Sequence, residues 1–400
     1  MESAEQHNNP DRRKFIATAG VAAAAVTALS QTQVALGKST APRDGVEWRN
    51  KQSGMAYRRF GRANIMVSEM VFGGLSIGLE EKKWKFLETG IEKGINYIDT
   101  ASGYNKTESE QAVANVINTS SKRQQVYVAT KASGWFGDAR KPVYDKIWDT
   151  LDPRAQGRVR ARIGAIIERR EILDDYYLCN YGDWQVEQAE TYLRDDVMEA
   201  MFGRQVSAED RRGMVEKMIT EVESSLKRLG TDHVDVLMAP HGCTAPEEVI
   251  IPEVLEAAAK LKKSGKIRFF GFTAHNEPAG ALRAAANSEV HDMGMIAYNV
   301  SNAPWVEPAL AEAGRKDLGV VAMKVARAPF PDRGGKVDAL PGLEEKLHKL
   351  VTGDMHIAEK AYLWALQNPN LTCCVSAMFD DEKTLANCKL TGRRINLGKG

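Results

Sequence analysis

Short apolar runs alternate with helical patterns along most of the chain. Eight such runs, each followed by apolar residues at helical spacing, are centred near residues 70, 97, 128, 236, 269, 296, 321 and 374. Apolar strands that alternate with helices are typical of a parallel sheet buried on both faces. Eight such units predict a closed (β/α)8 barrel. An open, doubly wound sheet is the alternative, which the absence of a G-x-G-x-x-G turn after a strand disfavours.

Two segments depart from this alternation. The run YRRFGRANIMVSEMVFGG predicts a short hairpin around residues 61–64, ahead of the first barrel strand. After Lys131, the third predicted strand is followed by roughly 80 residues, whereas βα loops usually take about 2–6. Residues 137–213 within this stretch repeat apolar positions at helical spacing. The sequence therefore predicts a helical insertion that leaves the carboxyl end of strand 3.

The position of the insertion indicates a role beside the barrel mouth. Its first bulky residues, Trp135 and Phe136, are suited to form a wall of a substrate pocket. We expect the insertion to close one side of that pocket, or to contact a partner chain or a second copy there. An ornament that packs on the outer helices is the alternative.

The N-terminus has the pattern of an export signal. Arg12, Arg13 and Lys14 precede an uncharged stretch, residues 15–37, that is rich in Ala and Gly and only weakly apolar. Paired arginines before such a stretch resemble a bacterial twin-arginine signal, read by the twin-arginine (Tat) export machinery. We expect a signal peptide over 1–37, a polar linker over 38–54, and a periplasmic protein. An uncleaved membrane anchor is the alternative.

Composition and charge exclude several other classes. The chain is 43% hydrophobic and 27% charged, which is an ordinary globular balance. Its 54 Lys and Arg residues balance 53 Asp and Glu residues, so no net field favours nucleic acid. The five cysteines show no C-x-x-C spacing, so neither a metal site nor a disulfide framework is expected. The adjacent Cys373 and Cys374 are expected in the core.

Candidate catalytic residues follow three neighbouring predicted strands. Strand 2 ends at Asp99 and runs into Tyr104, strand 3 ends at Lys131, and His241 follows strand 4. In a barrel, the carboxyl ends of the strands carry the active site. A lysine ammonium should lower the pKa of a neighbouring phenol, which is normally about 10. The set suits protonation of an oxygen while a hydride reaches carbon, with a structural ion pair and an ordinary loop histidine as the alternatives.

The motifs around these residues resemble one enzyme family. The runs GINYIDTASGYNKTESE, VYVATK, SSLKRLGTDHVDVLMAPH and GKIRFFGFTAH are similar to the aldo-keto reductase family. The resemblance covers Met55 to about residue 395 except the insertion, so we expect an aldo-keto reductase-like barrel over 55–400, and it implies NADPH-dependent reduction of a small aldehyde or ketone, or the reverse reaction. It makes Tyr104 the general acid, with Lys131 and Asp99 as tuning residues. His241 would orient the carbonyl.

The resemblance also implies a cofactor site, with some departures. The expected cofactor-binding residues are Thr273, Asn299, Lys324, Ser376, Lys383 and Asn387. Of the positions that usually hold the nicotinamide carboxamide, only Thr273 keeps a hydrogen-bonding side chain. NADP is the expected cofactor, and NAD stays open because Lys383 is the single positive charge at the place of the 2′-phosphate. These departures favour the alternative of a barrel that serves as a cofactor-binding or regulatory subunit.

The histidine is displaced by one residue from the usual pattern. Asp235 and His241 are six positions apart instead of five, and Pro240 stands at the expected place. We expect a bulge to restore the aim of His241, since proline is tolerated at bulges and strand ends. His275, after the fifth strand, is expected at the surface.

Overall fold

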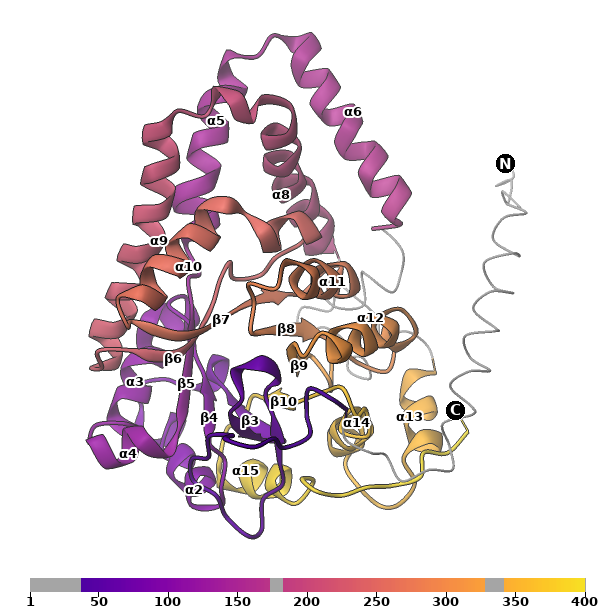
Figure 1. Ribbon diagram of the computed structural model, residues 1–400. Helices are drawn as coiled ribbons and strands as arrows, with labels where there is room; N and C mark the ends of the chain where they lie inside the picture. The colour runs from indigo at the N-terminus through magenta and orange to yellow at the C-terminus, as the bar shows by residue number, and fades with distance from the viewer. Residues whose placement is uncertain (1–36, 173–182, 328–341, 400) are drawn as a thin grey trace.

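Eight parallel strands close into a barrel. The computed structural model describes residues 37–172, 183–327 and 342–399, so the predicted export signal lies outside the described residues except for Gly37. Neighbouring strands pair in parallel around the ring, which confirms the predicted (β/α)8 fold (Figure 1). In order around the barrel, the strands are β10 (Cys373–Ser376), β3 (Met70–Gly73), β4 (Tyr97–Asp99), β5 (Tyr127–Lys131), β6 (Val234–Met238), β7 (Ile267–Ala274), β8 (Met293–Ala297) and β9 (Gly319–Met323).

Helices cover the outside of this barrel (Figure 1). Some of them begin and end where the sequence provides caps. The longest, α9, begins after Ser207, whose hydroxyl accepts from Asp210 N, and ends at Gly230 with φ +63°. The covering helices are α2 (Phe86–Glu92), α3 (Glu108–Val116), α4 (Ser120–Gln125), α9 (Ala208–Leu229), α10 (Pro252–Lys263), α11 (Pro278–Ser288), α12 (Ala303–Arg315), α13 (Leu343–Leu350), α14 (Ile357–Ala365) and α15 (Asp381–Cys388). None of the helices described is long and apolar enough to cross a bilayer.

Side chains alternate between the barrel interior and the helix layer. One buried cluster fills the interior and includes Tyr97, Tyr127 and Cys373, while a second lies between strands and helices and includes Ile98 and Cys374. This is the period-2 alternation expected of a strand. Both cysteines are fully buried, as the sequence predicts for core residues. The same alternation turns every second strand residue toward the barrel axis.

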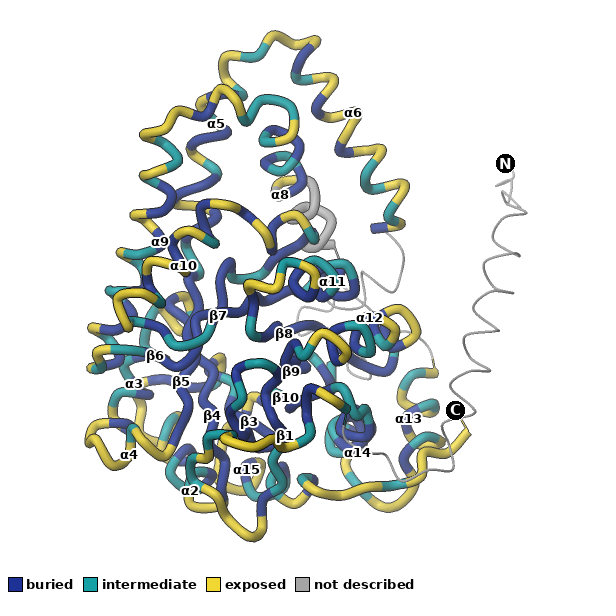
Figure 2. The backbone as a smooth tube through the Cα atoms, in the orientation of Figure 1, coloured by how far each residue is buried: buried dark blue, intermediate teal, exposed yellow. Residues whose placement is uncertain are grey.

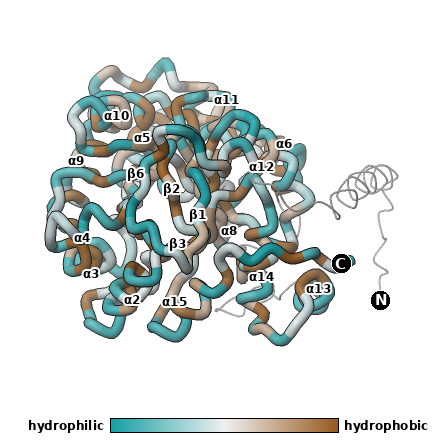
Figure 3. The backbone as a smooth tube through the Cα atoms, turned by 60° about the horizontal axis from the view of Figure 1, so that its bottom comes forward, coloured by the Kyte–Doolittle hydropathy of each residue, from teal (hydrophilic) through white to brown (hydrophobic). Residues whose placement is uncertain are grey.

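A hairpin closes the amino-terminal end of the barrel (Figure 3). Strands β1 (Tyr57–Arg59) and β2 (Met66–Ser68) pair antiparallel, which confirms the predicted hairpin. The turn between them places Phe60 and Ile65 in the interior cluster. Gly61 lies against the start of β9, where a Cβ atom would come within 2.2 Å of Gly319 N. Only glycine fits this close approach, and its φ of +52° also favours glycine.

The connection between β5 and β6 is helical, as predicted. It holds a π-helical turn, η5 (Phe136–Arg140), and the helices α5 (Lys141–Thr150), α6 (Pro153–Arg170) and α8 (Asp183–Phe202), before α9 returns to the barrel. Figures 1 and 2 show α6 as an outer arm whose surface is largely exposed. Its role as an insertion over 137–213, and an association with another chain through it, stay predictions.

The pocket wall expected from the start of this connection is not found. Trp135 and Phe136 are 1% and 6% exposed, and both belong to the core beneath the helices. The indole nitrogen of Trp135 donates to Met214 O on α9 at 2.9 Å. Their bulk anchors the connection to α9, because burying an aromatic ring against a helix stabilises more than exposing it in a mouth. The expectation that they line a pocket is therefore wrong.

Buried charges dock the helical connection on the barrel. Arg140 of η5 lies 2.6 Å from a carboxylate oxygen of Asp196 on α8 and 3.7 Å from one of Glu248. Glu248 belongs to η7 (Pro246–Ile250), and its other oxygen accepts from Thr244 N at 2.6 Å. Thr244 lies three residues after His241. We call Arg140, Asp196 and Glu248 the Arg140 cluster, because the single guanidinium joins the connection to the segment behind His241.

Candidate active site

Strand pairing brings Asp99 and Lys131 together at the carboxyl end of the barrel. Asp99 on β4 is paired with Ala129 on β5, and Lys131 lies two residues further along β5 on the same face. Its ammonium Nζ is 2.6 Å from Asp99 Oδ2 and 2.9 Å from Thr100 O. Both side chains are at most 2% exposed. Burial alone would lower the pKa of Lys131, but the interactions of its ammonium with Asp99 and Tyr104 raise it overall. The ammonium therefore stays charged.

Tyr104 stands directly above this ion pair. It begins η4 (Tyr104–Thr107), the turn that follows β4, and Lys131 Nζ lies 4.5 Å from the centre of its ring. Burial raises the pKa of Tyr104, and the opposing effect of the Lys131 ammonium does not reverse it. The expected net lowering is therefore wrong: desolvation of a phenolate outweighs the attraction of one ammonium. The phenol holds its proton at neutral pH, as a proton donor must.

His241, the fourth predicted catalytic residue, lies beside Tyr104. Its ring centre lies 5.7 Å from that of Tyr104, edge to face, and its Nδ1 is 2.7 Å from Ser133 Oγ. Burial, together with the charge of Lys131, lowers the pKa of His241 to about 3, so the ring is neutral. The structure thus brings together all four predicted catalytic residues.

The extra residue before His241 does not form a strand bulge. The pairing of β6 with β7 keeps one register from Val234 to Met238. The displacement is taken up after the strand, where the peptide bond between Ala239 and Pro240 is cis. The expectation of a bulge is therefore wrong. The loop after β6, and not the strand itself, carries His241 to Tyr104.

The predicted cofactor residues lie at the same end of the barrel, at the ends of β7 to β10 and on α15. Thr273, the last residue but one of β7, is buried, and its hydroxyl oxygen accepts from Gly242 N at 2.6 Å. Asn299 follows β8, is buried, and its oxygen accepts from Ser301 N at 3.1 Å. Its amide nitrogen donates to the carbonyl of Lys324, which follows β9, at 3.4 Å. The strand order β7–β8–β9 places the three residues side by side along the rim, and their cofactor role stays a prediction.

The remaining three predicted residues divide into a buried pair and an exposed lysine. Asn387 of α15 donates to Ser376 Oγ at the end of β10, at 3.0 Å, and both are buried. Lys383 is exposed on the first turn of α15 and lies 4.0 Å from Asp380. The pair is held by the fold itself, whereas the cofactor role of exposed Lys383 stays a prediction.

His275 lies close enough to the predicted site to feel the charges of Lys324 and Lys131, which the sequence did not reveal. It is half-buried after β7 instead of lying at the surface, so the expectation of a surface residue is wrong. Burial lowers its pKa well below the usual value, and Lys324 and His241 lower it further. Its place directly after a barrel strand is the signal that could have found it.

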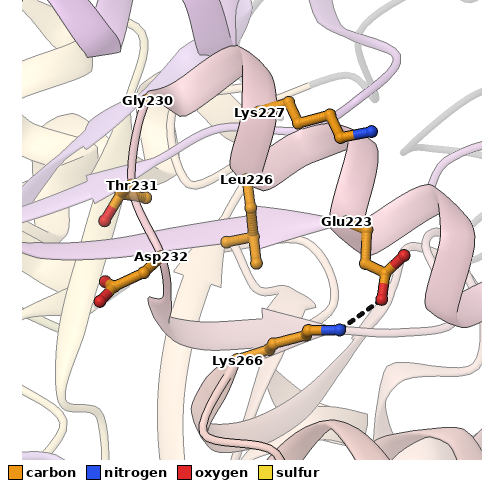
Figure 4. A pocket seen from close by; sticks show the side chains of 7 residues that line it. All are labelled: Glu223, Leu226, Lys227, Gly230, Thr231, Asp232 and Lys266. Carbon is orange, nitrogen blue, oxygen red and sulfur yellow. Dashed lines mark hydrogen bonds and ion pairs between the residues drawn. The ribbon is translucent and has the colours of Figure 1, made fainter.

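The hollow shown in Figure 4 is not the reaction site. It is lined by Glu223, Leu226, Lys227, Gly230, Thr231, Asp232 and Lys266, which surround the end of α9 and the residues before β6 and β7. These are the amino ends of the strands, opposite to Tyr104. The ion pair between Lys266 and Glu223 bridges part of it. In the described part of the chain, no three His, Cys, Asp or Glu side chains gather as a metal site would need.

Comparison with known proteins identifies the family. The sequence model of the Aldo/keto reductase family matches residues 69–390, so the chain belongs to this family. It is 33% identical over 315 residues to the aryl-alcohol dehydrogenase GME11368 of Pestalotiopsis microspora, covering 72% of this chain and 64% of that protein. The uncharacterized oxidoreductase YqkF of Bacillus subtilis is 25% identical over 220 residues, which is 55% of this chain and 49% of YqkF. The chain thus spans about half the length of YqkF and less than two thirds of GME11368.

Solved structures agree on the fold. The aldo-keto reductase AKR11C1 of Bacillus halodurans superposes with a TM-score of 0.53 at 20% identity, covering 84% of this chain and 90% of that one. An aldo-keto reductase of Klebsiella pneumoniae gives a TM-score of 0.50 at 18% identity, with 84% and 89% covered. These likenesses confirm the predicted barrel fold, and the family itself is shown by the sequence model.

Proposed function

We propose that the protein is a nicotinamide-dependent oxidoreductase that reduces an aldehyde or ketone to an alcohol, or catalyses the reverse. The observation that carries the proposal is the protonated Tyr104 phenol above the buried Lys131–Asp99 pair. The Klebsiella pneumoniae relative is described in complex with NADPH, which supports NADP as the cofactor. A small carbonyl compound is the proposed substrate class.

The residues at the barrel mouth fit a nicotinamide. Thr273 accepts from Gly242 N, and its hydroxyl hydrogen has no acceptor within residues 37–172, 183–327 and 342–399. It can therefore donate to the oxygen of a carboxamide. Asp99 Oδ1 is buried and lacks a hydrogen-bond partner in the same described ranges. A buried polar atom without a hydrogen-bond partner destabilises the folded protein, unless a bound ligand supplies that partner.

Each residue of this chain has a separate task in the reaction. The reduced nicotinamide, when bound, supplies a hydride to the carbonyl carbon. Tyr104 donates its phenolic proton to the carbonyl oxygen as negative charge develops there. The ammonium of Lys131 then stabilises the phenolate left behind, and Asp99 holds that ammonium in place. Neutral His241 donates a hydrogen bond that orients the oxygen.

The proposal is tested by cofactor binding and turnover in parallel. Purified protein is titrated with NADPH and with NADH while the nicotinamide fluorescence is followed, and oxidation of each is then measured with aromatic and aliphatic aldehydes. We expect binding and aldehyde-dependent oxidation. Binding without turnover of any carbonyl would instead favour a cofactor-binding or regulatory subunit, and absence of binding would contradict both readings.

We also propose export by the twin-arginine machinery, on the strength of Arg12, Arg13 and the weakly apolar stretch that follows. The double change Arg12→Lys, Arg13→Lys keeps the charge and removes the paired guanidinium groups. The expected result is loss of the processed protein from the periplasmic fraction and accumulation in the cytoplasm, measured by immunoblot. Unchanged export would indicate another signal, and an unprocessed protein in the membrane fraction would indicate an anchor.

A further inference from the structure

We propose that Ser133 sets the tautomer of His241, so that the ring carries its hydrogen on Nε2 and presents it as a donor. Ser133 lies two residues after Lys131, in the loop that leaves β5. Its hydroxyl oxygen is 2.7 Å from His241 Nδ1, which is within the range of a short hydrogen bond. Which of the two atoms donates follows from the other contacts of Ser133.

The hydrogen-bond inventory of Ser133 leaves one arrangement. Gly103 N donates to Ser133 Oγ at 3.1 Å, so one lone pair of the oxygen is used. The hydroxyl has a single hydrogen, and His241 Nδ1 is its only acceptor among the residues the structure describes. If Nδ1 donated to the second lone pair instead, the hydroxyl hydrogen would have no acceptor among the described residues, so the arrangement that satisfies both atoms has Ser133 donating to Nδ1. A neutral imidazole whose Nδ1 accepts must carry its hydrogen on Nε2.

His241 is neutral at neutral pH, as a nitrogen that accepts a hydrogen bond must be. Burial and the charge of Lys131 lower its pKa to about 3. An imidazolium would carry hydrogens on both nitrogens, and Nδ1 could not then accept from Ser133. The nearby ammonium thus protects the tautomer that Ser133 selects.

The loop that carries Ser133 is fixed from two sides. Glu221 of α9 accepts from Ser102 Oγ at 2.7 Å and from Gly134 N at 2.9 Å through the same oxygen. Ser102 Oγ in turn accepts from Ser133 N at 3.0 Å. A Cβ atom at Gly103 would come within 2.8 Å of Ser133 Cβ, so a glycine is needed beside the serine. These contacts hold the hydroxyl where it meets Nδ1, before any substrate binds.

Ser133 is a positioning residue, because it acts through His241 and touches no reacting atom. The consequence for catalysis rests on the proposed function: an Nε2–H donor orients the carbonyl oxygen, whereas an Nε2 lone pair would repel it. Loss of Ser133 leaves Nδ1 without its donor and frees the ring to adopt the other tautomer.

The test reads the tautomer directly by nitrogen NMR. The full chain is labelled with ¹⁵N-histidine, and His241→Asn identifies the His241 signals among its seven histidines. We expect a protonated Nε2 in the wild type and an increased Nδ1–H population in Ser133→Ala. Ser133→Thr keeps the hydroxyl on a half-buried position and should restore the wild-type signals. Ser224→Ala, which removes a hydroxyl bonded to Thr220 O within α9, is the matched control and should change nothing.

Turnover provides the second readout. The loss of one hydrogen bond should lower kcat/KM of Ser133→Ala about tenfold, and Ser133→Thr should recover most of it. A protonated Nδ1 in the wild type, or His241 signals that Ser133→Ala leaves unchanged, would overturn the proposal, and the wild-type spectrum decides even if the alanine variant does not fold. If the wild type reduced no carbonyl, the proposed function would fail while the tautomer result stood.

Discussion

Tyr104→Phe should lower kcat for carbonyl reduction about 10²–10⁴-fold, which is the usual contribution of a positioned general acid. The change removes one oxygen and leaves the ring that stacks over Lys131 Nζ at 4.5 Å. The Lys131–Asp99 pair at 2.6 Å does not depend on the phenol, so the fold should persist. Nicotinamide affinity, measured by fluorescence, should stay within about twofold, because the proposed carboxamide contact belongs to Thr273.

Tyr57→Phe is the matched control for this result. The Tyr57 hydroxyl bonds to Asn50 O at 2.7 Å at the opposite end of the barrel, so its loss costs some stability and no catalysis. Full activity in a well-folded Tyr104→Phe protein would remove Tyr104 from the reaction. A matching loss of activity in both variants would point to the fold instead of the acid.

Arg140→Met should lower the free energy of unfolding by about 3–5 kcal/mol at pH 8, because two buried carboxyl groups lose their cation. The side chains of Arg140, Asp196 and Glu248 are 4%, 9% and 0% exposed, so solvent cannot replace the guanidinium. The loss is measured by urea denaturation. Arg158→Met, on the exposed face of α6, is the control and should change stability by no more than about 0.5 kcal/mol.

The pH dependence of this loss has a definite sign. Burial, together with the Asp196 carboxylate, raises the pKa of Glu248 to about 8, against about 4.3 in an unfolded chain. Between these values the folded protein binds more protons than the unfolded one, so stability falls as the pH rises. Without Arg140 that fall should steepen, and the defect should shrink at pH 5. A defect that is equal at pH 5 and pH 8 would contradict this role of the Arg140 cluster.

Glu248→Gln separates charge from packing in the same cluster. The amide oxygen can still accept from Thr244 N, as the carboxylate does at 2.6 Å, and the amide group carries no charge. This variant should be nearly as stable as the wild type at pH 8 and less dependent on pH. Combined with Arg140→Met, it should recover part of the lost stability.

The sequence by itself determined the barrel and the pair at its centre. Strand positions follow from short apolar runs, because a strand buried on both faces carries mostly apolar residues. Asp99 and Lys131 end consecutive strands, and the carboxyl ends of parallel strands meet at one rim, so their encounter needs no knowledge of distant contacts. The motif around Tyr104 then identified the family.

Only the tertiary structure decided the protonation and the orientation of the residues in that site. The pKa of Tyr104 depends on how much water the loops exclude, which no local pattern reports. Trp135 turned into the core because α9, about 80 residues further along the chain, offers it a carbonyl and an apolar face. Ser133 and His241 are 108 residues apart and meet through two irregular loops. Loop paths are set by packing between distant segments, and therefore the hydrogen-bond direction that orients His241 exists only in the folded chain.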